Sequence, residues 1–283
     1  MSTKKANVIH SESVFSAADG YQLREQSWLP DADPKAIVAI IHGYAEHSDR
    51  YAHVAGYLAA AGYGVLSFDL RGHGKSDGKN THVGSFDEYL ADVDIFLTRI
   101  RQAFPGKKLF LLGHSMGGAI ASLYVITRQP DLAGLLLSGA LVKISDDISP
   151  LLVKLSGFIG KILPKWPTIK LDSKAISSDP DVVRRYETDP LIYRGGIPAR
   201  TGAEMNRAAT RIQSDMEAIK LPVLIMHGTA DRLSDPAGSQ QLHDRVSSTD
   251  KTLKLYPEFF HEIMNEPKKE HVLADIVAWL KQH

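Results

Sequence analysis

Short runs of apolar residues recur along this chain of 283 residues, and segments with helical periodicity separate several of them. The apolar runs are typical of buried strands, and they are Ile37–Ile41, Val65–Phe68, Leu109–Leu112, Leu135–Leu137, Val223–Met226 and the shorter Leu253–Tyr256. The helical segments are Tyr51–Ala61, Phe86–Ala103 and Met116–Arg128, and Val14–Trp28 before them indicates a hairpin that turns at Asp19-Gly20. This alternation predicts an α/β fold with a mostly parallel sheet and helices on both of its faces.

The alternation stops between Leu141 and Ile212, where prolines are frequent and no clear strand is found. We therefore expect a core made of residues 1–140 and 213–283, with residues 141–212 inserted as a cap. The most regular part of the cap is Ile148–Trp166, whose apolar residues follow i, i+3, i+4, i+7 spacing and are interrupted by lysines. Two interpretations stay open: a helix that packs on the core, and a basic amphipathic lid that lines an apolar entrance or rests on a lipid surface.

Composition excludes several classes of protein. The formal net charge is zero, so no electrostatic argument favours a nucleic-acid partner. The absence of cysteine excludes disulfides and thiolate chemistry and fits a reducing compartment. The basic N-terminus lacks a following apolar segment, and no apolar run is long enough to span a bilayer. We expect a cytoplasmic protein whose contact with a membrane surface, if any, is made through the cap.

A possible catalytic nucleophile lies near the middle of the chain. Residues Gly113-His-Ser-Met-Gly117 match the G-x-S-x-G pattern of a nucleophile elbow, with an apolar run before them and a helical segment after them. In such a turn the flanking glycines leave room for the backbone, and the helix that follows directs its free N–H groups toward the reacting atoms. The alternative is a glycine-rich turn without chemistry, and the clean strand and helix around Ser115 favour the nucleophile.

A serine nucleophile needs a histidine base, and in this arrangement the chain order is Ser, then Asp or Glu, then His. Of the histidines beyond the late strands, His227 ends an apolar run and is expected to shape a turn, and His243 lies in a helical stretch. His261 follows the last predicted strand, which is where the base belongs. The acid is either Asp231 or Asp235 by position. We favour Asp231, because Asp235 precedes a proline and is typical of a helix N-cap.

The same arrangement needs two N–H donors for the oxyanion of the tetrahedral intermediate. One is expected from the backbone of Met116, directly after the nucleophile. The other is expected from the loop after Ile37–Ile41, and there we choose the N–H of Tyr44, with Gly43 allowing the backbone to approach.

The segment Asp69-Leu-Arg-Gly-His-Gly-Lys-Ser76 has the glycines and charges of a phosphate loop but neither Walker nor G-x-G-x-x-G spacing. We interpret it as a structured turn in which Asp69, Arg71 and His73 bond locally beside the site. No H-E-x-x-H is present in the sequence. We therefore expect neither a metal ion nor a cofactor.

Five motifs in this order resemble the monoacylglycerol lipase and lysophospholipase group of α/β-hydrolases over nearly the whole chain. The motifs are His42-Gly-Tyr-Ala-Glu-His47 with Arg50-Tyr51, Asp69-Leu-Arg-Gly-His-Gly74, Gly113-His-Ser-Met-Gly-Gly118, His227-Gly-Thr-Ala-Asp-Arg232 and the late His261. The chain departs from the mammalian members of the group in lacking cysteine and in having Met264 where they place a second histidine.

The resemblance implies an α/β-hydrolase fold, a Ser115, Asp231, His261 triad, an oxyanion hole from Tyr44 and Met116, and a cap over an acyl-chain tunnel. It also places Glu46, Arg50 and Tyr186 near the glycerol end of the substrate.

The predicted function is therefore hydrolysis of a small-molecule lipid ester, best matched by a monoacylglycerol, through an acyl-enzyme. The alternatives are a general carboxylesterase or lysophospholipase, a non-catalytic ligand binder, and a peptidase that would use Glu46 and Glu187 for the substrate amine. Acyl-chain length, the alcohol group and the oligomeric state are left open by the sequence.

Overall fold

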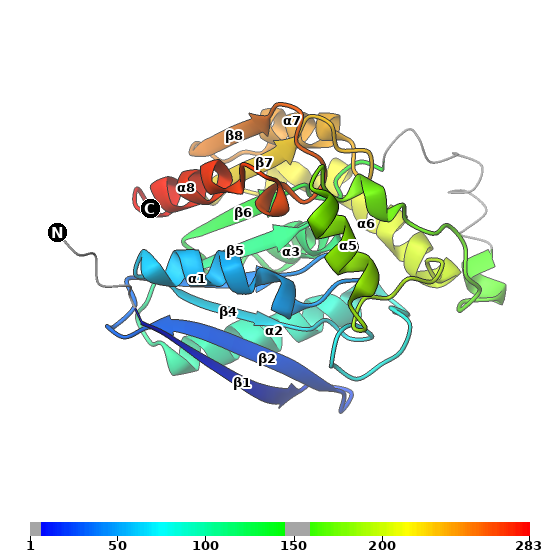
Figure 1. The fold of residues 1–283 in the computed structure, drawn as a ribbon, viewed down its shortest axis with the longest axis horizontal. Coiled ribbons are helices and arrows are strands. Elements are labelled where there is room, and N and C mark those ends of the chain that lie inside the picture. The colour runs from blue at the N-terminus through cyan, green and yellow to red at the C-terminus, as the bar shows by residue number, and fades with distance from the viewer. Residues whose placement is uncertain (1–6, 145–158) are drawn as a thin grey trace.

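The computed structural model describes residues 7–144 and 159–283, and these form an eight-stranded sheet with the order β1-β2-β4-β3-β5-β6-β7-β8 (Figure 1). The strands from β3 to β8 pair in parallel, whereas β1 pairs with β2 and β2 with β4 in antiparallel fashion. Their bounds are β1 Val8–Ser16, β2 Gln22–Pro30, β3 Ile37–Ile41, β4 Gly64–Phe68, β5 Leu109–His114, β6 Gly134–Ser138, β7 Val223–Gly228 and β8 Lys251–Tyr256. The predicted mostly parallel sheet is confirmed.

Helices cover both faces of this sheet. The α-helices are α1 Ala52–Ala60, α2 Phe86–Ala103, α3 Met116–Arg128, α5 Pro180–Thr188, α6 Ala199–Asp215, α7 Pro236–Arg245 and α8 Lys269–Leu280. Short 3-10 helices are η1 Ser48–Tyr51, η2 Ser173–Ala175, η3 Met216–Ala218 and η4 Ile263–Asn265. One apolar core joins the sheet to α2 and α3, and a second joins its other face to α1 and α8.

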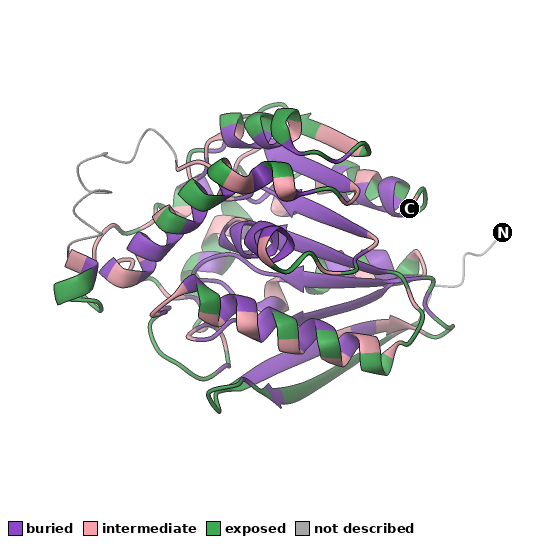
Figure 2. Ribbon diagram, turned by 180° about the vertical axis from the view of Figure 1, so that it is seen from behind, coloured by how far each residue is buried: buried purple, intermediate pink, exposed green. Residues whose placement is uncertain are grey.

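The central strands are mostly apolar because their side chains point alternately to the two faces of the sheet, and helices bury both faces. In β3, Ile37 and Ala39 belong to the core under α2 and α3, whereas Val38 and Ile40 belong to the core under α1 and α8. Figure 2 shows the same contrast across the sheet, with buried central strands and a largely exposed edge strand β1.

Most predicted elements are present, with differences at their ends. Helices α2 and α3 have the predicted bounds, and the Ser85 capping box fixes the start of α2. The predicted hairpin is longer than Val14–Trp28, because β1 and β2 pair without interruption from Val8 to Pro30. Strand β5 continues past Leu112 to His114, because both added residues still pair with β6. Apolar character therefore locates a strand better than it locates the strand's end.

In the described part of residues 141–212, pairing outside helices is limited to isolated bridges, and α5 and α6 are the main elements. Figure 1 shows both helices beyond the carboxyl ends of the parallel strands, and α6 packs against α3. Asp179 caps α5 and is followed by Pro180 at the first helical position. Most of the helix expected over Ile148–Trp166 lies outside the described residues, and of its remainder 159–162 are helical. Among the described residues, we find no helix with the length and apolar character needed to cross a bilayer.

Candidate active site

Ser115 occupies the sharp turn between β5 and α3. Its backbone angles are φ 52° and ψ −120°, a conformation that costs about 1–3 kcal/mol for a residue with a side chain. Three backbone hydrogen bonds hold this turn: Ser115 N–H donates to Ser138 O, and Ser115 O accepts from the N–H groups of Ala119 and Leu141. The strained conformation at the start of a helix is the geometry that the elbow motif predicts.

The glycines beside Ser115 are required by space. A Cβ on Gly113 would lie 2.4 Å from Gly117 O, and a Cβ on Gly117 would lie 2.2 Å from Ile41 O. Both distances are far below van der Waals contact. The start of α3 can therefore pack against β3 only because Gly117 carries no side chain, and β5 can approach the start of α3 only because Gly113 carries none.

Asp231 and His261 lie together in the structure, although 30 residues separate them along the chain. Asp231 follows β7 and His261 follows β8, and these neighbouring strands run in parallel, so their carboxyl ends meet at one edge. The Oδ2 atom of Asp231 lies 2.7 Å from Nδ1 of His261, and both side chains are almost fully buried. This hydrogen bond leaves the Nε2 atom of His261 to accept a proton from another group.

His227, which was expected to shape the turn after its strand, also bonds to Asp231. Its Nε2 lies 2.9 Å from Asp231 Oδ2, and its Nδ1 lies 2.7 Å from the Ser239 hydroxyl. The Ser234 hydroxyl donates to Asp231 Oδ2 as well, at 2.9 Å. Asp231 thus receives hydrogen bonds from two histidines rather than one.

Electrostatics set opposite shifts on the acid and the base. Burial alone would raise the pKa of Asp231, but the charge of His261 and the hydrogen bonds from His227 and His261 hold it well below its usual range. Burial alone would lower the pKa of His261, but Asp231 raises it above the ordinary value of 6.5. Burial lowers the pKa of His114, whose ring lies 4.8 Å from that of His261, to about 4. At neutral pH, Asp231 is therefore ionised and His114 neutral.

The N–H groups of Tyr44 and Met116 border the same space as Ser115. Both residues line a cavity together with Ser115 and His261. Among the described residues, neither N–H has a hydrogen-bond acceptor. Gly43 brings the loop close to the elbow, since a Cβ at Gly43 would lie 3.2 Å from the Ser115 Cβ.

Glu46 and Arg50 form a buried charge cluster at one side of this cavity. Arg50 Nη1 donates to Glu46 Oε2 at 2.8 Å, and Glu46 Oε1 accepts from Gly43 N–H at 2.6 Å and from Tyr51 Oη at 2.8 Å. Burial would raise the pKa of Glu46, but Arg50 and the nearby histidines lower it to about 2. The carboxylate therefore stays charged and fixes the loop that carries Tyr44.

Tyr186 of α5 covers this cluster. Its ring centroid lies 5.0 Å from the Arg50 guanidinium carbon, a cation–π contact, and its side chain lines the cavity. Burial raises the pKa of Tyr186 above its usual value, so its hydroxyl stays protonated. Of the three residues placed at the polar end of the site, Glu46 and Tyr186 line the cavity, and Arg50 lies behind them.

The cavity has a volume of about 550 Å³ and is lined mainly by apolar side chains. Ser115, His261 and Glu46 lie among the polar groups of its wall. Apolar lining residues include Leu141, Ile159, Ile169, Ile197, Met205 and Leu233. A mostly apolar cavity with a few convergent polar groups is the usual form of a small-molecule site.

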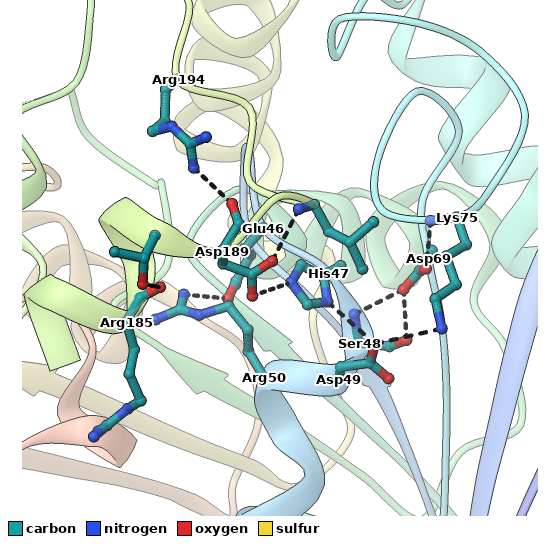
Figure 3. Close-up of polar contacts among 12 residues, drawn as sticks. Glu46, His47, Ser48, Asp49, Arg50, Asp69, Lys75, Arg185, Asp189 and Arg194 are labelled. Carbon is teal, nitrogen blue, oxygen red and sulfur yellow. Dashed lines mark hydrogen bonds and ion pairs between the residues drawn. The ribbon is translucent and has the colours of Figure 1, made fainter.

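The loop after β3 is anchored on two sides (Figure 3). On one side, the Asp69 carboxylate accepts from the N–H of Ser48 at 2.8 Å and from the N–H of Lys75 at 2.9 Å. On the other side, His47 Nε2 lies 3.0 Å from a carboxylate oxygen of Asp189, the residue directly after α5. Asp189 in turn accepts from Arg194 through its backbone carbonyl. The loop therefore connects the elements of the sheet to the segment above them.

The other residues considered from the sequence, His243, Asp235 and the Asp69–Ser76 turn, make contacts outside the Asp231–His261 pair. His243 is a partly exposed residue of α7 beside Asp244. Asp235 caps α7 through Ala237 N–H, as predicted, and pairs with Lys143. In the Asp69–Ser76 turn, His73 bonds to Arg71 O within the turn, but Arg71 reaches further and binds Asp92 of α2.

Sequence reasoning missed three polar residues at the site: His114, His227 and Glu262. Glu262 lines the cavity and forms an ion pair with Arg50 at 2.6 Å. His114 lines the cavity beside His261. Each had a signal in the sequence: His114 is adjacent to Ser115, Glu262 is adjacent to His261, and His227 lies at a strand end four residues before Asp231.

Comparison with known proteins finds a family model that matches most of the chain and several similar lipases. The family model described as "Serine aminopeptidase, S33" matches residues 32–268. A monoacylglycerol lipase of Mycolicibacterium smegmatis is 38% identical over 273 residues, covering 96% of this chain and 98% of the relative.

Two solved structures are also similar. The monoacylglycerol lipase of Paleococcus ferrophilus has a TM-score of 0.82 and 32% identity, covering 98% of this chain and 99% of that one. A soluble variant of the Saccharomyces cerevisiae monoglyceride lipase, solved with a substrate analog, has a TM-score of 0.86 and 25% identity, covering 99% and 97%.

Proposed function

This chain belongs to the monoacylglycerol lipase group of the α/β-hydrolases, and on that premise we propose that it hydrolyses monoacylglycerols to a fatty acid and glycerol. One observation carries the proposal. A strained serine, a histidine paired with a buried aspartate, and two N–H groups without acceptors among the described residues all border one mainly apolar cavity.

The reaction proceeds through an acyl-enzyme. His261 Nε2 takes the proton of Ser115 Oγ as this oxygen attacks the ester carbonyl carbon. The tetrahedral intermediate collapses, the bond to the glycerol oxygen breaks, and His261 returns the proton to that oxygen. Water then attacks the acyl carbon with its proton passing to His261, and the fatty acid leaves as Ser115 Oγ regains a proton.

The surrounding groups act on charge and orientation. Asp231 holds the His261 tautomer with Nδ1 protonated and stabilises the imidazolium that forms during each proton transfer. The N–H groups of Tyr44 and Met116 stabilise the oxyanion, and each contributes on the order of 3 kcal/mol to lowering the barrier. Neither His261 nor Ser115 needs a metal ion for these steps.

Each end of the cavity suits one part of the substrate. The apolar wall accepts the acyl chain, since burial of each methylene contributes about 0.8 kcal/mol. Glu46, Tyr186 and Arg50 form the polar end and suit the glycerol hydroxyls, with Glu46 as acceptor and the Tyr186 hydroxyl as donor. Residues 141–212 act as the cap that completes this cavity, and their described part supplies most of its apolar lining.

The cap also supports contact with a lipid surface. Ile162, Leu163 and Trp166 are large apolar residues that are more than half exposed. Lys161 and Lys165 are exposed beside them in the sequence. Apolar side chains flanked by lysines suit insertion into the interface of an anionic membrane. We place the protein in the cytoplasm at such a surface, in agreement with the lack of cysteine.

The name of the matched family model raises the peptidase alternative, and the charges in the cavity argue against it. An aminopeptidase needs a free carboxylate for the substrate amine. Of the described residues that line the cavity, Glu46 and Glu262 are acidic, and Arg50 pairs with both. Glu187 accepts a hydrogen bond from Ser173 and lines a different cavity.

A substrate series tests the proposal. Purified protein is assayed with monoacylglycerols of increasing chain length, with p-nitrophenyl esters and with aminoacyl amides, and a fluorophosphonate probe is mapped by mass spectrometry. We expect labelling of Ser115 and the highest kcat/KM on a monoacylglycerol of medium or long chain. A preference for acetate esters would support a general carboxylesterase, and the absence of any adduct on Ser115 would support a ligand binder.

A further inference from the structure

His227 is completely buried between the acid of the site and helix α7. Its side chain and that of Asp231 both have 0% exposure. Its two ring nitrogens contact different partners: Nε2 lies 2.9 Å from Asp231 Oδ2, and Nδ1 lies 2.7 Å from Ser239 Oγ. The imidazole thus bridges the carboxylate and a hydroxyl on α7, with no side left to solvent.

The partners determine which nitrogen carries the proton. An ionised carboxylate only accepts hydrogen bonds, so Nε2 of His227 must donate to Asp231. In the neutral ring Nδ1 then accepts, and the Ser239 hydroxyl is its donor. Ser239 therefore keeps the His227 tautomer in the form that donates to the acid, just as Asp231 keeps the tautomer of His261.

The hydrogen bonds to Asp231 divide into two groups. The Oδ1 atom accepts from the N–H groups of Leu233 and Ser234, and these belong to the same loop as Asp231. The Oδ2 atom accepts from His261, from the Ser234 hydroxyl and from His227. Of the described residues that bond to Oδ2, His227 alone approaches from strand β7, so it ties the carboxylate to the rigid sheet rather than to the loop.

We propose that His227 is a positioning residue that holds the Asp231 carboxylate in the orientation that His261 requires. This inference rests on the proposed function. It also extends it, because the site then contains a chain of four groups that runs from Ser239 through His227 and Asp231 to His261. A carboxylate shared by two imidazoles has its negative charge divided between them, so the strength of the Asp231–His261 bond depends on His227.

The charges around this chain must be considered in any pH experiment. His114 packs against His261, and the coulombic influence of Glu46 and Glu262 reaches His261. Both glutamates are paired with Arg50. None of these groups contacts His227 among the described hydrogen bonds, so a substitution at His227 leaves their pairing intact.

Substitutions of His227 by glutamine and by asparagine distinguish loss of the hydrogen-bond donor from loss of the imidazole ring. Glutamine places its amide nitrogen near the position of Nε2, whereas asparagine places it near Nδ1. We expect His227→Gln to stay within about threefold of the wild-type kcat on a monoacylglycerol, and His227→Asn to lose about tenfold in kcat with KM unchanged.

The acid limb of the pH profile of kcat/KM is the range in which activity falls as the pH drops. A packing defect at His227 would lower activity without changing the pH of this limb. In His227→Asn the whole charge of Asp231 acts on His261, so the limb moves to higher pH, whereas in His227→Gln it stays in place. His243→Asn on the exposed side of α7 is the matched control and should change neither value. The low-field proton resonance of the His261–Asp231 hydrogen bond, read in histidine-labelled protein, should shift only in the asparagine variant.

Two results would overturn the inference. In the first, both variants keep the wild-type kcat and the wild-type acid limb. In the second, the glutamine and asparagine variants lose the same factor in kcat. Should the asparagine variant fail to fold, Ser239→Ala tests the same chain, because it removes the donor that fixes the His227 tautomer. We expect it to shift the limb in the same direction by a smaller amount, and an unmoved limb would again refute the inference. If the wild-type protein hydrolyses no ester, the proposed function fails instead.

Discussion

Arg50 and Glu262 face each other through two contacts, Nη1–Oε1 at 2.6 Å and Nη2–Oε2 at 2.7 Å, although 212 residues separate them. Arg50 follows β3 and Glu262 directly follows His261, so this pair joins the loop of the proposed oxyanion hole to the loop of the proposed base. Arg50 also pairs with Glu46, and the three side chains are nearly buried. The single positive charge of Arg50 thus partly compensates the negative charges of two carboxylates at the wall of the cavity.

Removing this guanidinium should destabilise the protein. Arg50→Met leaves two buried carboxylates without their cationic partner, and we expect a loss of about 3 kcal/mol in the free energy of unfolding at pH 7.5. The pairing contributes stability above pH 4.5, the ordinary value for Glu46, that is lost as the pH falls toward its folded pKa of about 2. In the variant Glu46 loses the positive charge that lowers its pKa and takes up a proton more readily, so the deficit in stability should shrink at pH 5. Urea unfolding at pH 7.5 and at pH 5 measures the deficit in the free energy of unfolding.

Arg184→Met is the control. It breaks an exposed ion pair with Asp181 and should cost less than about 0.5 kcal/mol.

The pH dependence of activity should report the raised pKa of His261. His261 must be neutral to accept the Ser115 proton, so kcat/KM falls as the pH drops through its pKa, which lies above the ordinary 6.5. Glu262→Gln removes a negative charge that raises this pKa, so the acid limb should move to lower pH. Stopped-time assays between pH 5 and 9 measure the limb. An unchanged limb in Glu262→Gln would show that the charge of Glu262 does not reach His261.

Ser115→Ala should abolish turnover of a monoacylglycerol. Removal of the nucleophile in such a triad costs about a millionfold in kcat, and the helix and strand around it do not depend on the hydroxyl. Ser122→Ala in the following helix α3 is the matched control, because its hydroxyl is buried without a hydrogen-bond partner among the described residues. Titrimetric release of fatty acid gives the rates, and circular dichroism gives the fold. Residual turnover near the wild-type rate would contradict the assignment of Ser115.

The elbow should tolerate no methyl group at Gly117. The Cβ of Gly117→Ala would lie 2.2 Å from a backbone oxygen of β3, so we expect a loss of at least about 3 kcal/mol and of most activity. Gly56→Ala in α1 meets no atom within 4 Å and should instead stabilise the helix by about 0.5–1 kcal/mol. Thermal unfolding of the two variants should therefore shift in opposite directions. A stable, active Gly117→Ala protein would mean that β3 and the elbow can separate.

Lipid-surface contact through the cap should depend on its exposed apolar residues. The double variant Ile162→Ser, Leu163→Ser should lower binding to vesicles that contain anionic lipid by about tenfold. Ile9→Ser on β1 changes a side chain of similar exposure at the far edge of the sheet and should bind as the wild type does. Vesicle sedimentation gives the binding constants. Equal binding by all three proteins would place the contact elsewhere.

The class of fold and the position of the elbow could be predicted from the sequence alone. Both depend on patterns that are local in the chain. The central strands are apolar because both faces of the sheet are covered, and the G-x-S-x-G turn lies between a strand and a helix whose bounds, for α3, were predicted correctly. The order of Asp231 and His261 along the chain also selected them among several acids and histidines.

The partners of the buried charges around this site follow from the tertiary structure and not from the sequence pattern. His227 and Asp231 are four residues apart, yet their contact depends on how the loop after β7 folds back over that strand. Arg50 and Glu262 meet because the parallel strands β3 and β8 both present their carboxyl ends to the same edge, which no local pattern records. Chain direction and periodicity fix an element, whereas the partner of a buried charge is fixed by the register and order of strands distant in sequence.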